Sequence, residues 1–161
     1  MGFIKKLLQS FKSRNKVEYE ILEYNRDFIK NLVNDHQRFF ELYHAIKDQF
    51  VTNSDYDQMK KHIQNFKVAI ELHLMMEDTK LYGYLRKIHQ DNELLYELVE
   101  ETQQETDEIA DEVLEFIEKY SHEENYKSNI NNFMNELEDM YRLLSKRIEL
   151  EENKLFPLYR E

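Results

Sequence analysis

Apolar residues recur every three or four positions along most of this chain, which is the period of an amphipathic α-helix. The most regular stripe lies in the last third of the chain: Ile130, Phe133, Leu137, Met140, Leu144, Leu155 and Leu158. Stripes of this kind occupy four tracts, which we place near residues 17–51, 55–89, 92–120 and 122–156. Short polar links between long helices favour antiparallel neighbours. The pattern therefore predicts an all-α fold, in which residues 17–161 form one up-down four-helix bundle.

The first sixteen residues form a separate segment with its own pattern. Apolar residues at helical spacing alternate with basic ones: Phe3, Ile4, Leu7, Leu8 and Phe11 against Lys5, Lys6 and Lys12. Residues 1–16 thus predict a short basic amphipathic helix. Two roles stay open for this helix. It either caps the bundle with its apolar face or contacts a protein partner or an anionic membrane surface.

Composition supports the helical prediction and narrows the classes of partner. Gly occurs twice and Pro once, so few residues punctuate the helices. The formal net charge of −11 argues against nucleic acid as a partner. The sequence contains no cysteine, which excludes disulfides and thiolate metal sites. The sequence shows neither a secretory signal nor a run of about 20 apolar residues that would span a membrane, so we expect a cytoplasmic protein.

Polar residues interrupt the apolar stripe of every tract at positions that should face the core. They are His36, His73, Glu77, Thr102, Glu105, Arg147 and Glu151. The segment from His73 to Tyr82 also has an echo from Arg147 to Phe156, which indicates that the second and fourth tracts are related halves. We expect these seven side chains to meet at one depth in the bundle.

A buried polar layer must satisfy its own hydrogen-bonding groups or bind a ligand, because unpaired polar groups cost several kcal/mol each. Imidazole nitrogens and carboxylate oxygens from facing helices are typical ligands of di-iron and di-manganese bundles. The alternative is a metal-free network in which Arg147 bridges the carboxylates. The three carboxylates, two neutral imidazoles and Arg147 sum to a charge of −2, which one divalent ion would neutralise.

Three segments together resemble the hemerythrin-like, or HHE cation-binding, domains. They are Asp35-His36-Gln37, His73 to Asp78 with Leu81-Tyr82, and Glu151-Glu152 followed by Leu155-Phe156-Pro157. The resemblance covers most of the chain after the basic segment and implies an up-down bundle that holds two non-heme irons. By position it makes His36, His73, Glu77 and Glu151 the metal ligands.

The chain departs from the pattern of this family at two positions. Arg147 stands where the family usually has a histidine four residues before the glutamate, and Thr102 stands near another expected histidine. We expect Glu105 to supply the missing ligand, with Arg147 and Thr102 supporting the site. A carboxylate-rich site of this kind favours hard ions and is less suited to reversible oxygen carriage.

The resemblance implies a non-heme iron protein, mononuclear or dinuclear, that binds or senses oxygen, nitric oxide or iron, or handles iron. Another divalent metal fits the same ligands. No nucleophile and base combination is visible, which favours a binding module over an enzyme, although an iron-dependent oxidase or peroxidase stays open. The alternative function is a metal-free descendant of such a domain that regulates a protein partner.

Overall fold

The computed structural model describes residues 22–161, and every regular element in that range is a helix. In chain order they are α2 (Phe28–Thr52), α3 (Tyr56–Met76), the π-helical segment η1 (Glu77–Leu81), α4 (Tyr82–His89), α5 (Glu93–Tyr120), α6 (Glu123–Ser128), α7 (Ile130–Leu150), the π-helical segment η2 (Glu151–Leu155) and the 3₁₀ segment η3 (Phe156–Leu158). The predicted all-α fold is confirmed. The predicted basic helix at residues 1–16 lies outside the described residues.

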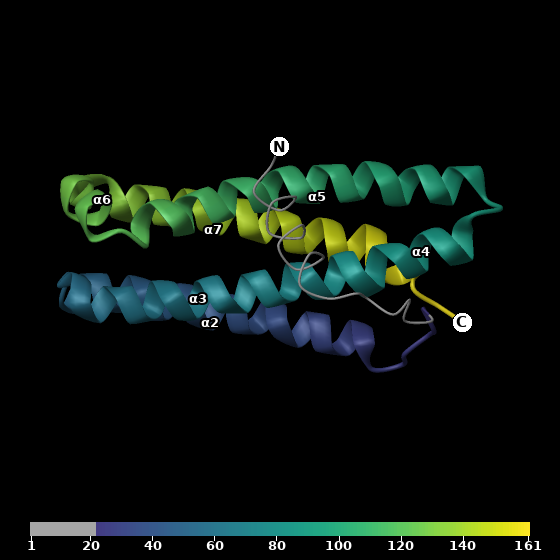
Figure 1. Cartoon of the computed structure of the whole chain (residues 1–161), viewed down its shortest axis with the longest axis horizontal. Coiled ribbons are helices and arrows are strands. Elements are labelled where there is room, and N and C mark those ends of the chain that lie inside the picture. The colour runs from purple at the N-terminus through teal and green to yellow at the C-terminus, as the bar shows by residue number, and fades with distance from the viewer. Residues whose placement is uncertain (1–21) are drawn as a thin grey trace, which may run out of the picture.

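The long helices lie side by side along the long axis of the molecule (Figure 1). Helix α2 packs against α3 and α5 packs against α7. Short links fold α3 back along α2 and α5 back along α4, and α6 leads into α7, which runs back along α5 (Figure 1). Along the described residues, no helix has both the length and the apolar character needed to cross a membrane.

Helix boundaries match two predicted tracts and correct the other two. The second tract ends at His89 and the third at Tyr120, as expected. Within the described residues the first tract becomes helical at Phe28, because residues 22–27 are not helical and a turn begins at Asn25. Its side chain accepts a hydrogen bond from the backbone N–H of Asp27, and its carbonyl accepts one from Phe28. The fourth tract is broken at Asn129, between α6 and α7, so the described chain has more separate helices than the four predicted tracts.

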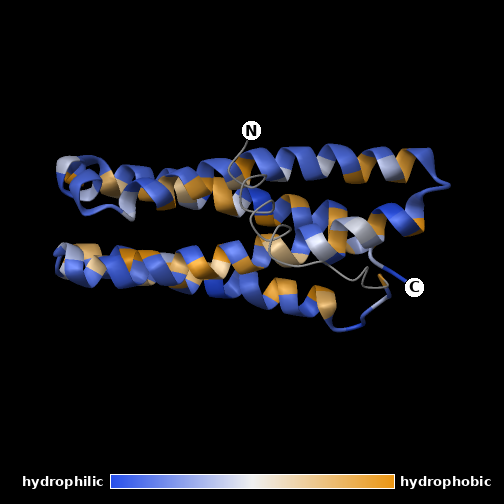
Figure 2. Ribbon diagram, in the orientation of Figure 1, coloured by the Kyte–Doolittle hydropathy of each residue, from blue (hydrophilic) through white to orange (hydrophobic). Residues whose placement is uncertain are grey.

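The apolar core is divided into two clusters by buried polar residues. Apolar and polar residues interleave along each helix (Figure 2). The larger cluster includes Phe39, Ile70, Ile109 and Leu144, and the smaller one includes Leu32, Leu81, Val99 and Leu155. Buried polar residues lie where the two clusters meet along each long helix, with Leu74 and Ile148 of the larger cluster among them. They are His36 in α2, His73 and Glu77 in α3 and η1, Thr102 and Thr106 in α5, and Arg147 and Glu151 in α7 and η2. A polar layer thus crosses the core.

The two π-helical segments begin at equivalent residues of the sequence echo. Segment η1 begins at Glu77, four residues after His73, and η2 begins at Glu151, four residues after Arg147. Short π-helical segments inside α-helices are rare and often occur at functional sites. The echo in the sequence is therefore matched by local structure, and both unusual segments begin at the polar layer.

Candidate metal centre

Six of the seven predicted layer residues are buried. Their exposed fractions are His36 0%, His73 2%, Glu77 1%, Thr102 2%, Arg147 2% and Glu151 0%. Glu105 corrects the prediction, because its side chain is 40% exposed and forms an ion pair with Lys146 at 2.9 Å. The buried face of α5 steps from Thr102 to Thr106, four residues on, which turns Glu105 toward the solvent. Sequence reasoning missed Thr106, which is fully buried in the place expected for Glu105.

Two imidazoles and two carboxylates converge from three parts of the bundle. The Nε2 atom of His36 lies 2.9 Å from Oε2 of Glu151. The Nε2 atom of His73 lies 3.8 Å from the same oxygen and 3.5 Å from Oε1 of Glu77. One ligand atom each from His36, His73 and Glu151 can be chosen so that all three lie within 4.8 Å of one another. This spacing matches atoms that share one small ion.

The opposite nitrogen of each imidazole faces a second carboxylate. Oε1 of Glu152 lies 2.7 Å from Nδ1 of His36, and Oδ2 of Asp35 lies 3.3 Å from Nδ1 of His73. A carboxylate accepts hydrogen bonds, so each Nδ1 carries the proton and donates it. In a neutral imidazole the Nε2 atom then keeps a free lone pair, as in carboxylate–histidine–metal arrangements. Both free lone pairs point to the side where Glu77 and Glu151 lie.

The converging atoms have no hydrogen-bond partners among the described residues. They are Nε2 of His36, Nε2 of His73, Oε1 of Glu77 and Oε2 of Glu151, whereas Oε1 of Glu151 lies against the guanidinium of Arg147. Acceptors that face one another in a buried site are costly unless a proton or a cation lies between them. A divalent cation would satisfy these atoms together, so the residues present fit a metal ion.

Arg147 lies on the other side of the two carboxylates. Its Nη2 atom lies 2.5 Å from Oε2 of Glu77, and its Nε atom lies 2.6 Å from Oε1 of Glu151. Its Nη1 atom donates a hydrogen bond to the carbonyl of Thr106, so α5 joins the site through its backbone. Burial alone would lower the pKa of Arg147, but Glu151 and Glu77 outweigh it and raise that pKa. The guanidinium is therefore a permanent positive charge in the layer.

The same neighbouring charges also shift the pKa values of Glu151 and His73. Burial would raise the pKa of Glu151, but Arg147 and the two histidines lower it below its ordinary value. Burial would lower the pKa of His73, but Glu77, Asp35 and Glu151 together raise it well above 6.5. The layer thus holds the ionised carboxylate of Glu151 next to a histidine that attracts either a proton or a cation.

Two further buried groups complete this part of the core. The Tyr82 hydroxyl lies 2.9 Å from the hydroxyl of Thr106. Burial, followed by the charge of Glu77, raises the pKa of Tyr82 well above 10, so it stays a neutral phenol. Thr102 is buried one turn before Thr106 on the same face of α5. The supporting role predicted for Thr102 remains a prediction.

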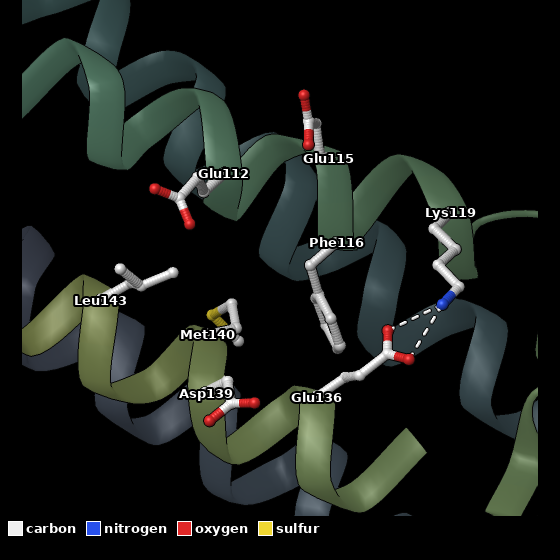
Figure 3. A pocket seen from close by; sticks show the side chains of 8 residues that line it. All are labelled: Glu112, Glu115, Phe116, Lys119, Glu136, Asp139, Met140 and Leu143. Atoms are coloured by element: carbon white, nitrogen blue, oxygen red, sulfur yellow. Dashed lines mark hydrogen bonds and ion pairs between the residues drawn. The ribbon is translucent and has the colours of Figure 1, made fainter. Parts of the chain in front are cut away.

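A surface groove between α5 and α7 is a separate feature. Figure 3 shows its lining residues, Glu112, Glu115, Phe116 and Lys119 from α5 with Glu136, Asp139, Met140 and Leu143 from α7. The amine of Lys119 contacts both oxygens of Glu136, at 2.9 and 2.8 Å. The groove is lined by no histidine and by none of the converging atoms, so it is separate from the buried cluster.

Comparison with known proteins finds one protein family. The model of the family described as hemerythrin HHE cation binding domain matches residues 27–159, which include every residue of the cluster. No curated protein and no solved structure matches the chain.

Proposed function

Because the chain belongs to the family of hemerythrin HHE cation-binding domains, we propose that it binds a metal ion, iron foremost, between His36, His73, Glu77 and Glu151. The single observation that carries this proposal is the set of buried, unpaired acceptor atoms on these four side chains. We also propose that α2, α3 with α4, α5, and α6 with α7 serve as the four arms of an up-down bundle around the ion.

The donor set supports iron among the metals that suit this site. Imidazole nitrogen and carboxylate oxygen are the ligands of non-heme iron(II) sites, which often combine two histidines with one carboxylate and keep positions open. Manganese and zinc also accept such ligands, and we propose them as the next candidates. When bound, iron would supply a redox-active centre able to take a diatomic gas such as oxygen or nitric oxide.

The protein residues around the site favour binding or sensing over turnover of a larger substrate. Each of the four proposed ligands is at most 2% exposed, so the site excludes molecules much larger than a gas or a water molecule. Glu152 and Asp35 hold the two imidazoles in the orientation that points Nε2 inward. Arg147 holds Glu77 and Glu151. We therefore propose a role in sensing, binding or storing iron or a diatomic gas.

One observation favours a second candidate function, a metal-free regulatory bundle. Arg147 already contacts one carboxylate oxygen of Glu77 and one of Glu151, and the raised pKa of His73 favours its imidazolium form when no metal is bound. The charges of His73 and Arg147 would then balance those of Glu77 and Glu151. In this candidate the polar layer is structural, and the protein acts by binding a partner, with the basic segment at residues 1–16 as the proposed contact.

Anaerobic loading with iron(II), followed by elemental analysis, separates the two candidates. We expect one iron per chain in the unaltered protein. His36→Ala should abolish binding, because it removes an Nε2 atom that faces Glu151. His44→Ala is the matched control, since His44 lies on the same helix and is exposed. Iron far below one per chain in the unaltered protein, or equal iron in both variants, would contradict the proposed site.

A further inference from the structure

We propose that the guanidinium of Arg147 acts as a built-in second cation, so that this centre accepts one divalent ion and excludes a second. This inference rests on the proposed function, since it concerns how many ions the cluster holds. It assigns Arg147 a role in setting the stoichiometry of the site, beyond its role in pairing buried carboxylates.

The first support is the way in which each carboxylate is shared. Glu77 directs Oε1 toward Nε2 of His73 and Oε2 toward the guanidinium. Glu151 directs Oε2 toward the two imidazoles and Oε1 toward the guanidinium. Both carboxylates thus bridge between the space facing the imidazoles and the head group of Arg147. A bridging carboxylate commonly joins two cations, and here one of the two positions is filled by a side chain.

The second support is the equivalence of the two halves of the chain. His73 and Glu77 lie four residues apart at the start of η1, and Arg147 and Glu151 lie four residues apart at the start of η2. Both pairs are buried in the same layer. The two halves therefore place equivalent positions in the core, one with a metal-binding imidazole and the other with a fixed positive charge.

The third support is the charge of the layer. The buried carboxylates Glu77 and Glu151 carry −2, and Arg147 reduces this to −1 when the imidazoles are neutral. Asp35 and Glu152 are left out of this sum because they are partly exposed, so the solvent screens their charges. One divalent ion brings the layer to +1, whereas two would bring it to +3. Glu105 adds no negative charge to the layer, because it pairs with Lys146 at the surface. An excess of three positive charges in a buried site is strongly unfavourable.

Stoichiometry measured with cobalt(II) tests the inference without any assay of activity. The protein is titrated anaerobically and the bound ions are counted by native mass spectrometry, with the electron paramagnetic resonance spectrum as a second readout. We expect one cobalt per chain and the spectrum of an isolated ion in the unaltered protein. Arg147→His removes the fixed charge and gives the second half the same donor pair as the first, so we expect two ions with magnetic coupling between them.

Arg147→Lys is the matched control, because it keeps a positive charge at the same position. We expect one ion in this variant. If circular dichroism shows that Arg147→His is unfolded, Arg147→Gln replaces it, and a second ion should still bind because the charge is gone. Two ions in the unaltered protein or in Arg147→Lys would overturn the inference, as would one ion in the folded neutral variant.

The same titration separates failure of this inference from failure of the proposed function. An unaltered protein that binds no cobalt, iron, manganese or zinc would refute both. An unaltered protein that binds two ions would refute the role of Arg147 and leave metal binding intact. One ion in the unaltered protein and two in Arg147→His would support both.

Discussion

The carboxylate of Glu152 provides a sharp test of the metal centre, because it lies outside the cluster and still touches one of its imidazoles. Oε1 of Glu152 lies 2.7 Å from Nδ1 of His36, and the side chain is 37% exposed. Its hydrogen bond keeps the proton on Nδ1 and leaves Nε2 free for a metal. Glu152→Gln keeps an acceptor oxygen and loses the charge, whereas Glu152→Ala loses both.

The expected magnitude follows from carboxylates that support metal-bound histidines in other proteins. Removing such a partner weakens metal affinity by about 10- to 100-fold, or about 1.4 to 2.8 kcal/mol. We expect Glu152→Gln near the lower end of this range and Glu152→Ala near the upper end. Asp35→Asn should have a smaller effect, because its contact with His73 is longer, at 3.3 Å. Since Glu152 is partly exposed, the metal-free stability should change by less than about 0.5 kcal/mol.

Competition between the protein and a chelator for cobalt(II) measures the affinity of each variant. Glu149→Gln is the control, because Glu149 is an exposed residue of the same helical arm and its loss changes the net charge equally. We expect Glu149→Gln to match the unaltered protein. Equal affinities for Glu152→Gln, Glu152→Ala and Glu149→Gln would refute the reasoning that Glu152 orients a metal ligand.

Three further predictions concern stability. A metal present at about 100 times its dissociation constant should stabilise the fold by about 2.7 kcal/mol and raise the melting temperature by about 5 to 11 °C, measured by circular dichroism with and without chelator. Glu77→Gln leaves the buried Arg147 guanidinium with one carboxylate, so it should cost the metal-free protein about 3 to 5 kcal/mol in urea denaturation. An effect below about 1 kcal/mol would show that this pair is not needed. Burial, opposed by Arg147, raises the pKa of Asp107 to about 6. An ionised Asp107 therefore lowers the free energy of unfolding above that pH. Below about pH 4 it has no effect, because its carboxyl group is protonated in both the folded and the unfolded protein. Asp107→Asn should stabilise the protein by on the order of 1 to 2 kcal/mol near pH 8, and this gain should vanish as the pH approaches 4. A gain in stability that is independent of pH would show that it does not come from the ionisation of Asp107.

The period of the apolar residues carried most of the information about the fold. Steps of three and four residues identified the buried faces, and the ends of the second and third tracts at His89 and Tyr120 agree with the structure. The start of the first helix was misjudged because the turn at Asn25 depends on local hydrogen bonds that the stripe does not reveal. The assignment of residues 1–16 as a separate segment remains a prediction.

Interruptions of the stripes located the polar layer, but they did not resolve its details. Thr102, Thr106 and Glu105 lie within one turn of α5, and a choice between Glu105 and Thr106 requires the rotation of that helix relative to its neighbours. The contacts of Asp35 and Glu152 were also invisible, because each reaches an imidazole on a different helix. A single stripe cannot show contacts between helices.

The sequence contains a signal for the π-helical segments, but that signal alone does not identify them. His73, Glu77, Leu81 and Leu85 are buried at three successive steps of four residues. In a regular α-helix each such step turns the face by about 40°, so the run would leave the core. The wider turn of η1 absorbs this rotation and keeps Leu81 and Leu85 inside. A buried polar pair that is continued by further steps of four residues is therefore the sequence signal from which a π-helical segment could be predicted.

The division of the core into two clusters has a consequence for how the protein opens. The smaller cluster, which includes Phe28, Leu85 and Phe156, is separated from the larger one along each long helix by the polar layer. The proposed ligands are part of that layer and come from α2, α3, η1 and η2, so an ion would join the helices that carry both compartments. Without it, amide protons in α4 and η3 should exchange with solvent sooner than those near Phe133 and Ile63 in the larger cluster. Occupancy of the proposed centre would therefore decide how much earlier the smaller compartment opens than the larger one.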